Sequence, residues 1–333
     1  MRLTDRIAAA NAWAQRQKAV RVFVRYGRDR GPILASGLAY QALFAVFAGL
    51  WVAFSVAGVV VSGDTLLRQT LLDFLAGVVP GLIKDGSRNG AIDPEVFSAG
   101  VEFGVSGLVA FVGLLFTALG WLASARDSVR TLFDLPPAST NVVLQKLIDL
   151  ALGVAFGVLL LIAAGLSFAG TTATEGVLGW LGIDARSVIG LVLSRTVTLV
   201  VAVLVYATAL AGLYRLLAGV KVPARILRHG VMLGAIGLAA LTVAGGLLLG
   251  GARSNPLIGS FAVVAGLLIY YNFVSQVILI AATWMAVDVD DEGIVIDRKV
   301  FEARLEQARA LVAAHTPQPP PKRGFWQRLF GRR

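Results

Sequence analysis

Cysteine is absent from the sequence, and histidine occurs only twice, as His229 and His315. The absence of cysteine excludes disulfide frameworks, cysteine nucleophiles and thiolate zinc sites, and two histidines leave haem and histidine metal centres short of ligands. Charge is scarce as well, because charged residues make up 15% of the chain against about 25% in an ordinary soluble domain. With 57% hydrophobic residues, the chain cannot cover a soluble surface. We therefore expect an integral membrane protein rather than a soluble multidomain enzyme.

Sequence signatures of catalysis are also missing. The chain has no Gly-x-x-x-x-Gly-Lys-Ser/Thr phosphate loop and no Gly-x-Ser-x-Gly nucleophile elbow. His229 lies beside Arg228 in a basic segment and His315 lies in the C-terminal tail, so neither is placed for triad or metal chemistry. We expect a non-enzymatic protein with no catalytic residue, cofactor or metal. One acidic cluster could hold a divalent ion, although a solvated stretch is the preferred interpretation. Its members are Asp288, Asp290, Asp291 and Glu292.

Long apolar runs without charge dominate what the sequence does contain. There are six such runs, of 19 to 34 residues, and a bilayer core of about 30 Å needs roughly 20 residues of helix. They cover residues 31–63, 103–125, 150–174, 196–214, 230–252 and 254–287. These runs are too long for barrel strands and lack strict alternation, and only a helix satisfies its own backbone in lipid. The sequence therefore predicts an all-α integral membrane protein with six transmembrane helices.

The distribution of basic residues predicts the orientation of these spans. Of the 30 lysines and arginines, 24 fall in segments that six spans would place on one side of the membrane. These segments are 1–32, 125–149, 215–229 and 288–333. The positive-inside rule puts that side, and with it both termini, in the cytoplasm. The net charge of +10 is then a consequence of topology, and we expect no nucleic-acid partner.

Segments outside the spans divide the chain further. Residues 64–80 place apolar side chains on one helical stripe, which predicts an amphipathic helix on the outer face that either covers the span ends or has a gating role. The predicted parts are a basic amphipathic N-terminal segment (1–32), a six-span membrane domain (33–287), a charged cytoplasmic helix (288–316), and a Pro-rich linker with a basic aromatic tail (317–333).

The C-terminal tail combines aromatic and basic side chains on one short helix candidate. Such a segment fits binding to an anionic cytoplasmic leaflet, and a disordered tail that only satisfies the positive-inside rule is an equal alternative. The predicted anionic-lipid contacts are Lys322, Arg323, Trp326, Arg328, Arg332 and Arg333.

Polar side chains within the predicted spans are few, and such groups are costly in lipid unless they meet a partner or a water-filled cavity. The first and sixth runs carry most of them, so we infer that these two spans line one polar interior surface. The alternative is simple hydrogen bonding between helices. Arg195, near the outer end of the fourth run, either attracts an anionic head group or extends to the membrane surface. The candidate cavity lining is Ser36, Tyr40, Gln41, Arg195, Tyr270, Asn272 and Gln276.

Three short motifs occur in a definite order along the chain. They are Leu38-Ala39-Tyr40, then Leu213-Tyr214-Arg215 with Val220, Val222 and Gly230, and then the stretch from Leu267 to Ile280. Together they resemble the YihY/BrkB family of bacterial inner-membrane proteins over roughly residues 20–290.

The resemblance implies six spans with both termini in the cytoplasm of a bacterial plasma (inner) membrane. Family members have carried a virulence-factor label and a ribonuclease label, but no carboxylate or histidine constellation able to hold catalytic metals is visible. Where the family has Gly-Ala-Glu at the end of the sixth span, this chain has Ala281-Ala282-Thr283, so no role of that glutamate carries over.

These observations favour a non-enzymatic carrier or transporter of a lipid or an amphipathic envelope precursor, with membrane lipids as partners. The alternative is an envelope scaffold whose basic tail recruits protein partners or anionic lipid. An ion-coupled transporter of small solutes is disfavoured, because no ionisable residues cluster at the middle of the predicted spans. Close glycine pairs such as Gly246 and Gly250 are expected by chance in so glycine-rich a chain and do not predict an oligomeric state.

Overall fold

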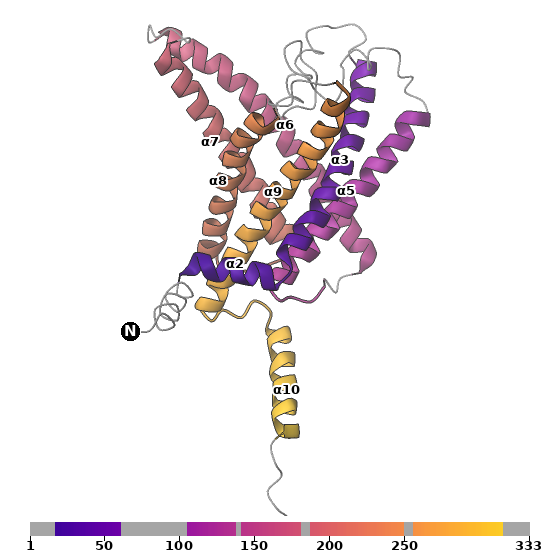
Figure 1. Ribbon diagram of the computed structural model, residues 1–333, viewed down its shortest axis with the longest axis vertical. Helices are drawn as coiled ribbons and strands as arrows, with labels where there is room; N and C mark the ends of the chain where they lie inside the picture. The colour runs from indigo at the N-terminus through magenta and orange to yellow at the C-terminus, as the bar shows by residue number, and fades with distance from the viewer. Residues whose placement is uncertain (1–16, 61–104, 138–140, 181–186, 250–255, 316–333) are drawn as a thin grey trace, which may run out of the picture. The chain divides into compact units, whose positions relative to one another are not determined.

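The computed structural model describes residues 17–60, 105–137, 141–180, 187–249 and 256–315, and over these residues the chain is helical with no β-strand. The elements are α2 (Lys18–Arg28), α3 (Gly31–Val60), α5 (Val105–Leu132), α6 (Val142–Trp180), α7 (Val188–Gly212), the π-helical turn η2 (Leu213–Leu217), α8 (Ala224–Leu249), α9 (Pro256–Asp291) and α10 (Arg298–His315) (Figure 1). The predicted all-α class is confirmed for this part of the chain.

The chain divides into two compact units, residues 1–294 and residues 295–333. The described residues of the first unit contain six long helices, α3 and α5 to α9, and each of them overlaps one of the six predicted apolar runs. Among the described residues, four segments are long and apolar enough to cross a membrane by length and composition, in α3, in α7 together with η2, in α8 and in α9. The number of spans and the side on which the termini lie stay predictions.

Several predicted segments fall outside the described residues. The outer amphipathic helix at 64–80, the basic aromatic tail at 317–333 and the first 16 residues are among them. In the second unit, α10 occupies most of the predicted charged helix, and its residues from Phe301 to His315 are all exposed. The four predicted parts of the chain are not tested further by the structure.

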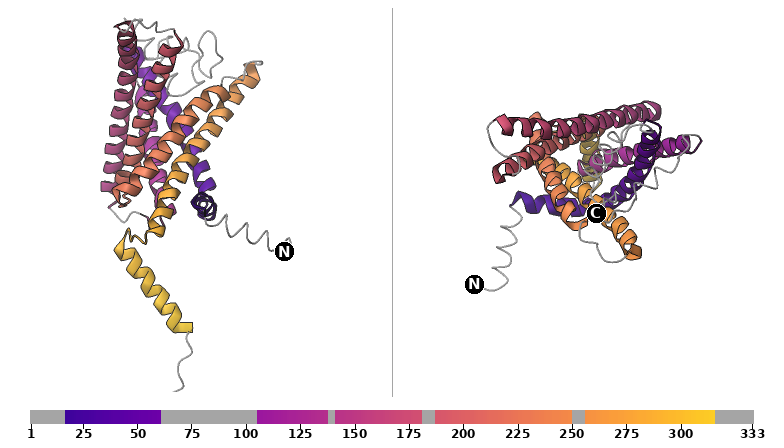
Figure 2. Two further views of the ribbon diagram at one scale, coloured as in Figure 1. Left: turned by 90° about the vertical axis from the view of Figure 1, so that its left-hand side faces the viewer. Right: turned by 90° about the horizontal axis from the view of Figure 1, so that it is seen from above.

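The six long helices of the first unit pack in a closed order. Helix α3 packs against α5 and α9, α9 against α8, α8 against α7, α7 against α6, and α6 against α5. In Figure 1 the α6–α7 hairpin leans toward one side and the α3–α5 pair toward the other as the helices run upward, and Figure 2 shows the same bundle from two further directions. The helices are therefore closest at one end.

Helix α2 lies across the lower ends of the long helices in Figure 1 and contacts α9 and α3. A sharp corner joins it to α3, since Arg30 has a φ of 58°, a left-handed conformation that is uncommon for a residue other than glycine. The ring of Tyr26 packs on Gly31 so closely that a Cβ on this glycine would lie 2.1 Å from Tyr26 Cε2. The corner thus needs a glycine as the first residue of α3.

We call the end at which α2 lies the ion-paired end. It comprises α2, η2, the starts of α3, α6 and α8, and the ends of α5, α7 and α9. Among the residues that the structure describes, the ten largest fully buried side chains lie in the helix halves nearest this end, except Val220 in the loop between η2 and α8 and Leu267 farther along α9. Close backbone approach contributes, because a Cβ on Gly230 of α8 would lie 2.1 Å from Met285 Cγ of α9. The core of the bundle therefore sits at the ion-paired end.

Candidate functional site

A chain of uncharged polar side chains joins α9 to α3. Gln276 Nε2 donates to Asn272 Oδ1 at 2.6 Å, and Asn272 Nδ2 donates to Ser36 Oγ at 3.2 Å. The four-residue spacing stacks the two amides on one face of α9, and the packing of α9 on α3 brings Ser36 to them. Ser36 Oγ in turn donates to the carbonyl of Pro32 at 2.9 Å. We call Ser36, Asn272 and Gln276 the polar chain.

Apolar and aromatic side chains are exposed on both sides of the polar chain. On α3 the exposed stripe that contains Ser36 continues through Tyr40 and Phe44, whose rings meet edge to face with centroids 4.9 Å apart. On α9, Ile269 and Phe273 are exposed beside Asn272. Neither helix carries a formal charge between residues 31 and 60 or between residues 256 and 287. This surface can offer hydrogen bonds and apolar contact but no counter-charge.

The other predicted cavity residues lie apart from the polar chain. Tyr40 is exposed beside Phe44, and the Gln41 Oε1 atom is buried without a hydrogen-bond partner among the described residues. Tyr270 packs over Gly245 of α8, where a Cβ would lie 2.6 Å from its ring. Arg195 is exposed on α7, a helix that packs against α6 and α8. The structure thus brings together three of the seven predicted residues, and a cavity lined by all seven stays a prediction.

The acidic cluster at the end of α9 is ion-paired. Asp288 pairs with Lys18, Asp290 with Arg25 and Glu292 with Arg225, while Asp291 accepts two hydrogen bonds from Arg21, at 2.5 and 2.8 Å. The hydrogen bond to Asp291 raises the pKa of the Arg21 guanidinium above its ordinary value. Among the described residues, no group of acidic residues and histidines could hold a metal ion. The carboxylates neither form a metal site nor simply face solvent, because each has a basic partner.

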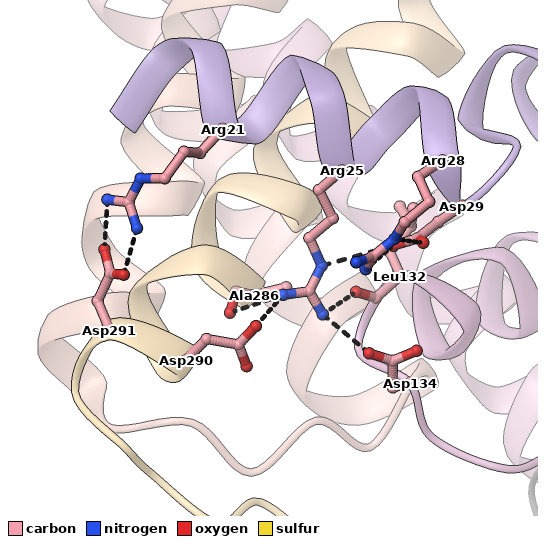
Figure 3. A network of polar contacts seen from close by, with 9 residues as sticks. All are labelled: Arg21, Arg25, Arg28, Asp29, Leu132, Asp134, Ala286, Asp290 and Asp291. Atoms are coloured by element: carbon pink, nitrogen blue, oxygen red, sulfur yellow. Dashed lines mark hydrogen bonds and ion pairs between the residues drawn. The ribbon is translucent and has the colours of Figure 1, made fainter. Parts of the chain in front are cut away.

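Arg25 is the centre of these contacts, with a side chain only 9% exposed. Besides Asp290, it reaches Asp134 at 3.2 Å, the carbonyl of Leu132 at 3.1 Å and the carbonyl of Ala286 at 3.5 Å (Figure 3). Leu132 and Asp134 belong to the end of α5, whereas Ala286 and Asp290 belong to α9. One guanidinium therefore ties α2 to two long helices, and five N–H donors in a planar fork suit arginine to this role.

Two further features complete the attachment of α2. The ammonium of Lys18 lies over the ring of Trp284, 4.1 Å from its centroid, which is cation–π geometry. Tyr26 is buried at the corner with α3, and this burial raises the pKa of its hydroxyl to about 12. Tyr26 therefore stays neutral at physiological pH. The charged contacts of α2 with α9 come instead from Lys18, Arg21 and Arg25.

A buried ion pair between α5 and α6 was missed by the sequence reasoning. Arg126 NH1 lies 2.5 Å from Asp149 Oδ1, with side chains 8% and 0% exposed. These two charges stand at the boundaries of the second and third apolar runs, so they were read as loop charges. Opposite charges at the facing ends of two consecutive antiparallel helices were the available signal. At this position they join the two helices rather than face water.

The family-like motif at the end of α7 forms part of the packed core. Tyr214 is fully buried, and its hydroxyl donates to the carbonyl of Ile278 on α9 at 2.8 Å. It lies in the π-helical turn η2, a geometry that is rare and costly unless tertiary contacts hold it. The motif thus fastens α7 to α9 at the ion-paired end.

No curated protein and no solved structure is significantly similar to the chain. One family profile, described as "Virulence factor BrkB", matches residues 22–293. The match spans the whole helical bundle of the first unit, including α2 from Val22 onward, and ends before α10. The chain therefore belongs to the BrkB virulence-factor family and is a helical membrane protein.

Proposed function

We propose that this chain is a non-enzymatic carrier in the bacterial inner membrane that moves or holds an amphipathic molecule, a lipid or an envelope precursor, between its helices. The observation that carries the proposal is the polar chain on α3 and α9, set in an exposed surface of apolar and aromatic side chains. An amphipathic molecule needs hydrogen bonds for its head and apolar contact for its tail, and this surface offers both.

The chemistry of the polar chain narrows the part of the substrate that binds there. Its amide and hydroxyl groups both donate and accept hydrogen bonds. Because α3 and α9 have no charge along their apolar lengths, a formal charge on the bound group would remain without a counter-charge, which is costly in an apolar setting. The polar chain therefore suits hydroxyl, ester or amide groups of a lipid head.

The proposed topology places all six long helices across the membrane with both termini in the cytoplasm. Its support is the agreement between six long helices and six apolar runs, together with the 24 of 30 basic residues that fall on one side. In this topology the ion-paired end lies at the cytoplasmic face. The opposite half of the bundle, where the helices diverge in Figure 1 and which we call the looser half, lies toward the outer leaflet.

Reconstitution in vesicles with labelled lipids tests the carrier function. We expect the full chain to redistribute lipid between leaflets. The double variant Asn272→Leu/Gln276→Leu removes both amide groups of the polar chain and should reduce the rate about tenfold or more, which corresponds to about 1.4 kcal/mol or more. Thr283→Val is the matched control, because Thr283 Oγ1 bonds only the carbonyl of Leu279 in its own helix. No protein-dependent redistribution for any lipid or envelope precursor would contradict the proposal.

A scaffold role is the second candidate, and α10 is the observation that favours it. This helix belongs to the second unit and exposes Phe301 and Leu311 to solvent. If recruitment of partners is the function, Phe301→Asp/Leu311→Asp or deletion of residues 317–333 should abolish it in cells while lipid redistribution in vesicles is unchanged. A carrier should keep most of its cellular function in both variants.

A further inference from the structure

Helix α2 attaches to the bundle in a different way from every long helix. Its buried side chains are Val22, Arg25 and Tyr26, whereas Phe23 and Val24 are 59% and 63% exposed. Only two apolar side chains therefore hold it against the core. The rest of the attachment is ionic, as Figure 3 shows for Arg21 and Arg25.

The ionic contacts form a row along one face of α2. Lys18, Arg21 and Arg25 are three and four residues apart, so they share a face, and they meet Asp288, Asp291 and Asp290 at the end of α9. We call these three pairs the latch.

The ion pairs of the latch are of a kind that can separate at low cost. Most of its side chains are partly exposed, from 19% for Asp288 to 64% for Asp290, and partly exposed ion pairs are weak and sensitive to salt. The contacts between α8 and α9 differ, because Gly230 and Met285 interlock through buried apolar atoms. Of the two kinds of contact at this end, the latch is the one whose opening leaves the packing of α8 on α9 intact, although Val22 and Tyr26 of α2 then leave buried positions.

The position of α2 relates it to the polar chain. It packs against α9 and α3, the two helices whose interface holds Ser36, Asn272 and Gln276. Through Arg25 it also holds the end of α5, the other neighbour of α3. Helix α2 therefore lies across the end of the seam that contains the polar chain.

We infer that α2 is a gate at the ion-paired end, held shut by the latch, and that its release opens the α3–α9 seam to the polar chain from that side. The inference rests on the proposed carrier function, because the gate controls access to the surface assigned to the substrate. When the three pairs are intact, as in this structure, a substrate reaches the polar chain from the exposed face of α3 and α9, and α2 covers the ion-paired end of the seam.

The absence of cysteine from the chain makes a crosslinking experiment direct. In Arg21→Cys/Asp291→Cys, a short, reducible bis-methanethiosulfonate reagent would fix α2 to α9. We expect crosslinking to lower lipid redistribution in vesicles at least tenfold and reduction to restore it. The matched control is Arg298→Cys/Glu302→Cys, which replaces an exposed ion pair of α10 and should leave the rate unchanged when crosslinked.

A second measurement separates failure of the gate from failure of the carrier. A cysteine at Gly37, where a new Cβ meets nothing within 4 Å, reports access beside Ser36 to a membrane-impermeant thiol reagent added on the α2 side. We expect Asp290→Asn/Asp291→Asn to raise the labelling rate about tenfold. This readout does not depend on transport.

The outcomes are distinguishable. If no variant moves lipid but the labelling changes as expected, the carrier proposal fails and the gate stands. If lipid moves equally fast with α2 crosslinked, and the labelling rate at position 37 is the same with and without Asp290→Asn/Asp291→Asn, the gate is overturned while the carrier stands.

Discussion

The two ends of the bundle are packed in different ways. At the ion-paired end, Tyr214 and Met285 are fully buried and a buried ion pair joins α5 to α6. Farther along, near the middle of α5 and α6, Phe116 and Leu161 are 81% and 68% exposed. Helices that are fastened at one end can change their spacing farther along without loss of these buried contacts. We therefore expect the ion-paired end to hold the fold and the helix spacing to vary in the other half.

The largest effect is expected at the buried pair of α5 and α6. Asp149→Leu leaves the buried Arg126 with only the exposed carboxylate of Asp127, 3.6 Å away, and removal of one partner from a buried pair typically costs about 3–5 kcal/mol. Thermal unfolding in detergent should show a large fall in melting temperature. The double variant Arg126→Met/Asp149→Leu should recover most of it. A single variant as stable as the wild type would show that this end is not held by the pair.

Close helix packing at the ion-paired end should give the next largest effect. Gly230→Ala forces Met285 to move and brings the new methyl group 3.3 Å from the carbonyl of Ala281, and overpacking costs about 1–3 kcal/mol. Gly157→Ala on α6 is the matched control, because a Cβ there meets nothing within 4 Å. If Gly230→Ala and Gly157→Ala lower the melting temperature equally, the ion-paired end is not packed more tightly than the rest of the bundle.

Removal of one buried hydroxyl should have a smaller effect. Tyr214→Phe deletes the hydrogen bond to the carbonyl of Ile278 and should cost about 1 kcal/mol, the usual net value for such a bond. Tyr206→Phe, which deletes a bond to Thr242 between α7 and α8, should cost about 0.6 kcal/mol. Equilibrium unfolding in mixed micelles measures both, and a larger cost for Tyr206→Phe would reverse the expected order.

The exposed part of the latch should contribute least to stability. Arg21 and Asp291 are 40% and 39% exposed, so Arg21→Gln should cost about 0–1 kcal/mol. Raising the salt concentration from 0.1 to 1 M, which shortens the Debye length from about 10 to 3 Å, should have a similarly small effect on the melting temperature. A loss of several kcal/mol would mean that α2 is part of the core and not a releasable gate.

Apolar periodicity and length were enough to predict the helices. A long apolar run without charge has one stable backbone form in lipid, so each of the six runs coincides with a helix, although α6 (Val142–Trp180) extends well beyond both ends of its run at 150–174. The stacking of Asn272 and Gln276 followed from their four-residue spacing. The contact of Asn272 with Ser36 is a hydrogen bond between helices, the alternative to a polar interior surface lined by the first and sixth spans, and that surface stays a prediction. Local geometry and a strong apolar pattern are readable from sequence.

Contacts between distant segments were not predictable in the same way. The separate helix α2 and its pairing with the end of α9 depend on a corner at Arg30 and on tertiary packing, which no local pattern encodes. The acidic residues after the last run were predicted to be solvated because their partners are far away in the sequence, 270 residues for Asp288 and Lys18 and 67 for Glu292 and Arg225. Tyr270 shares a helix with the polar chain but packs toward α8, because Gly245 leaves room for its ring.

Distance measurements between spin labels on cysteines introduced into this cysteine-free chain test the uneven bundle most directly. One pair, Thr131→Cys/His229→Cys, spans α5 and α8 at the ion-paired end, and the other, Phe111→Cys/Val192→Cys, spans α5 and α7 in the looser half; all four positions are exposed. We expect a narrow distance distribution for the first pair in every lipid, and a broad one that shifts with added lipid substrate for the second. Equally narrow and unchanging distributions for both pairs would contradict the account.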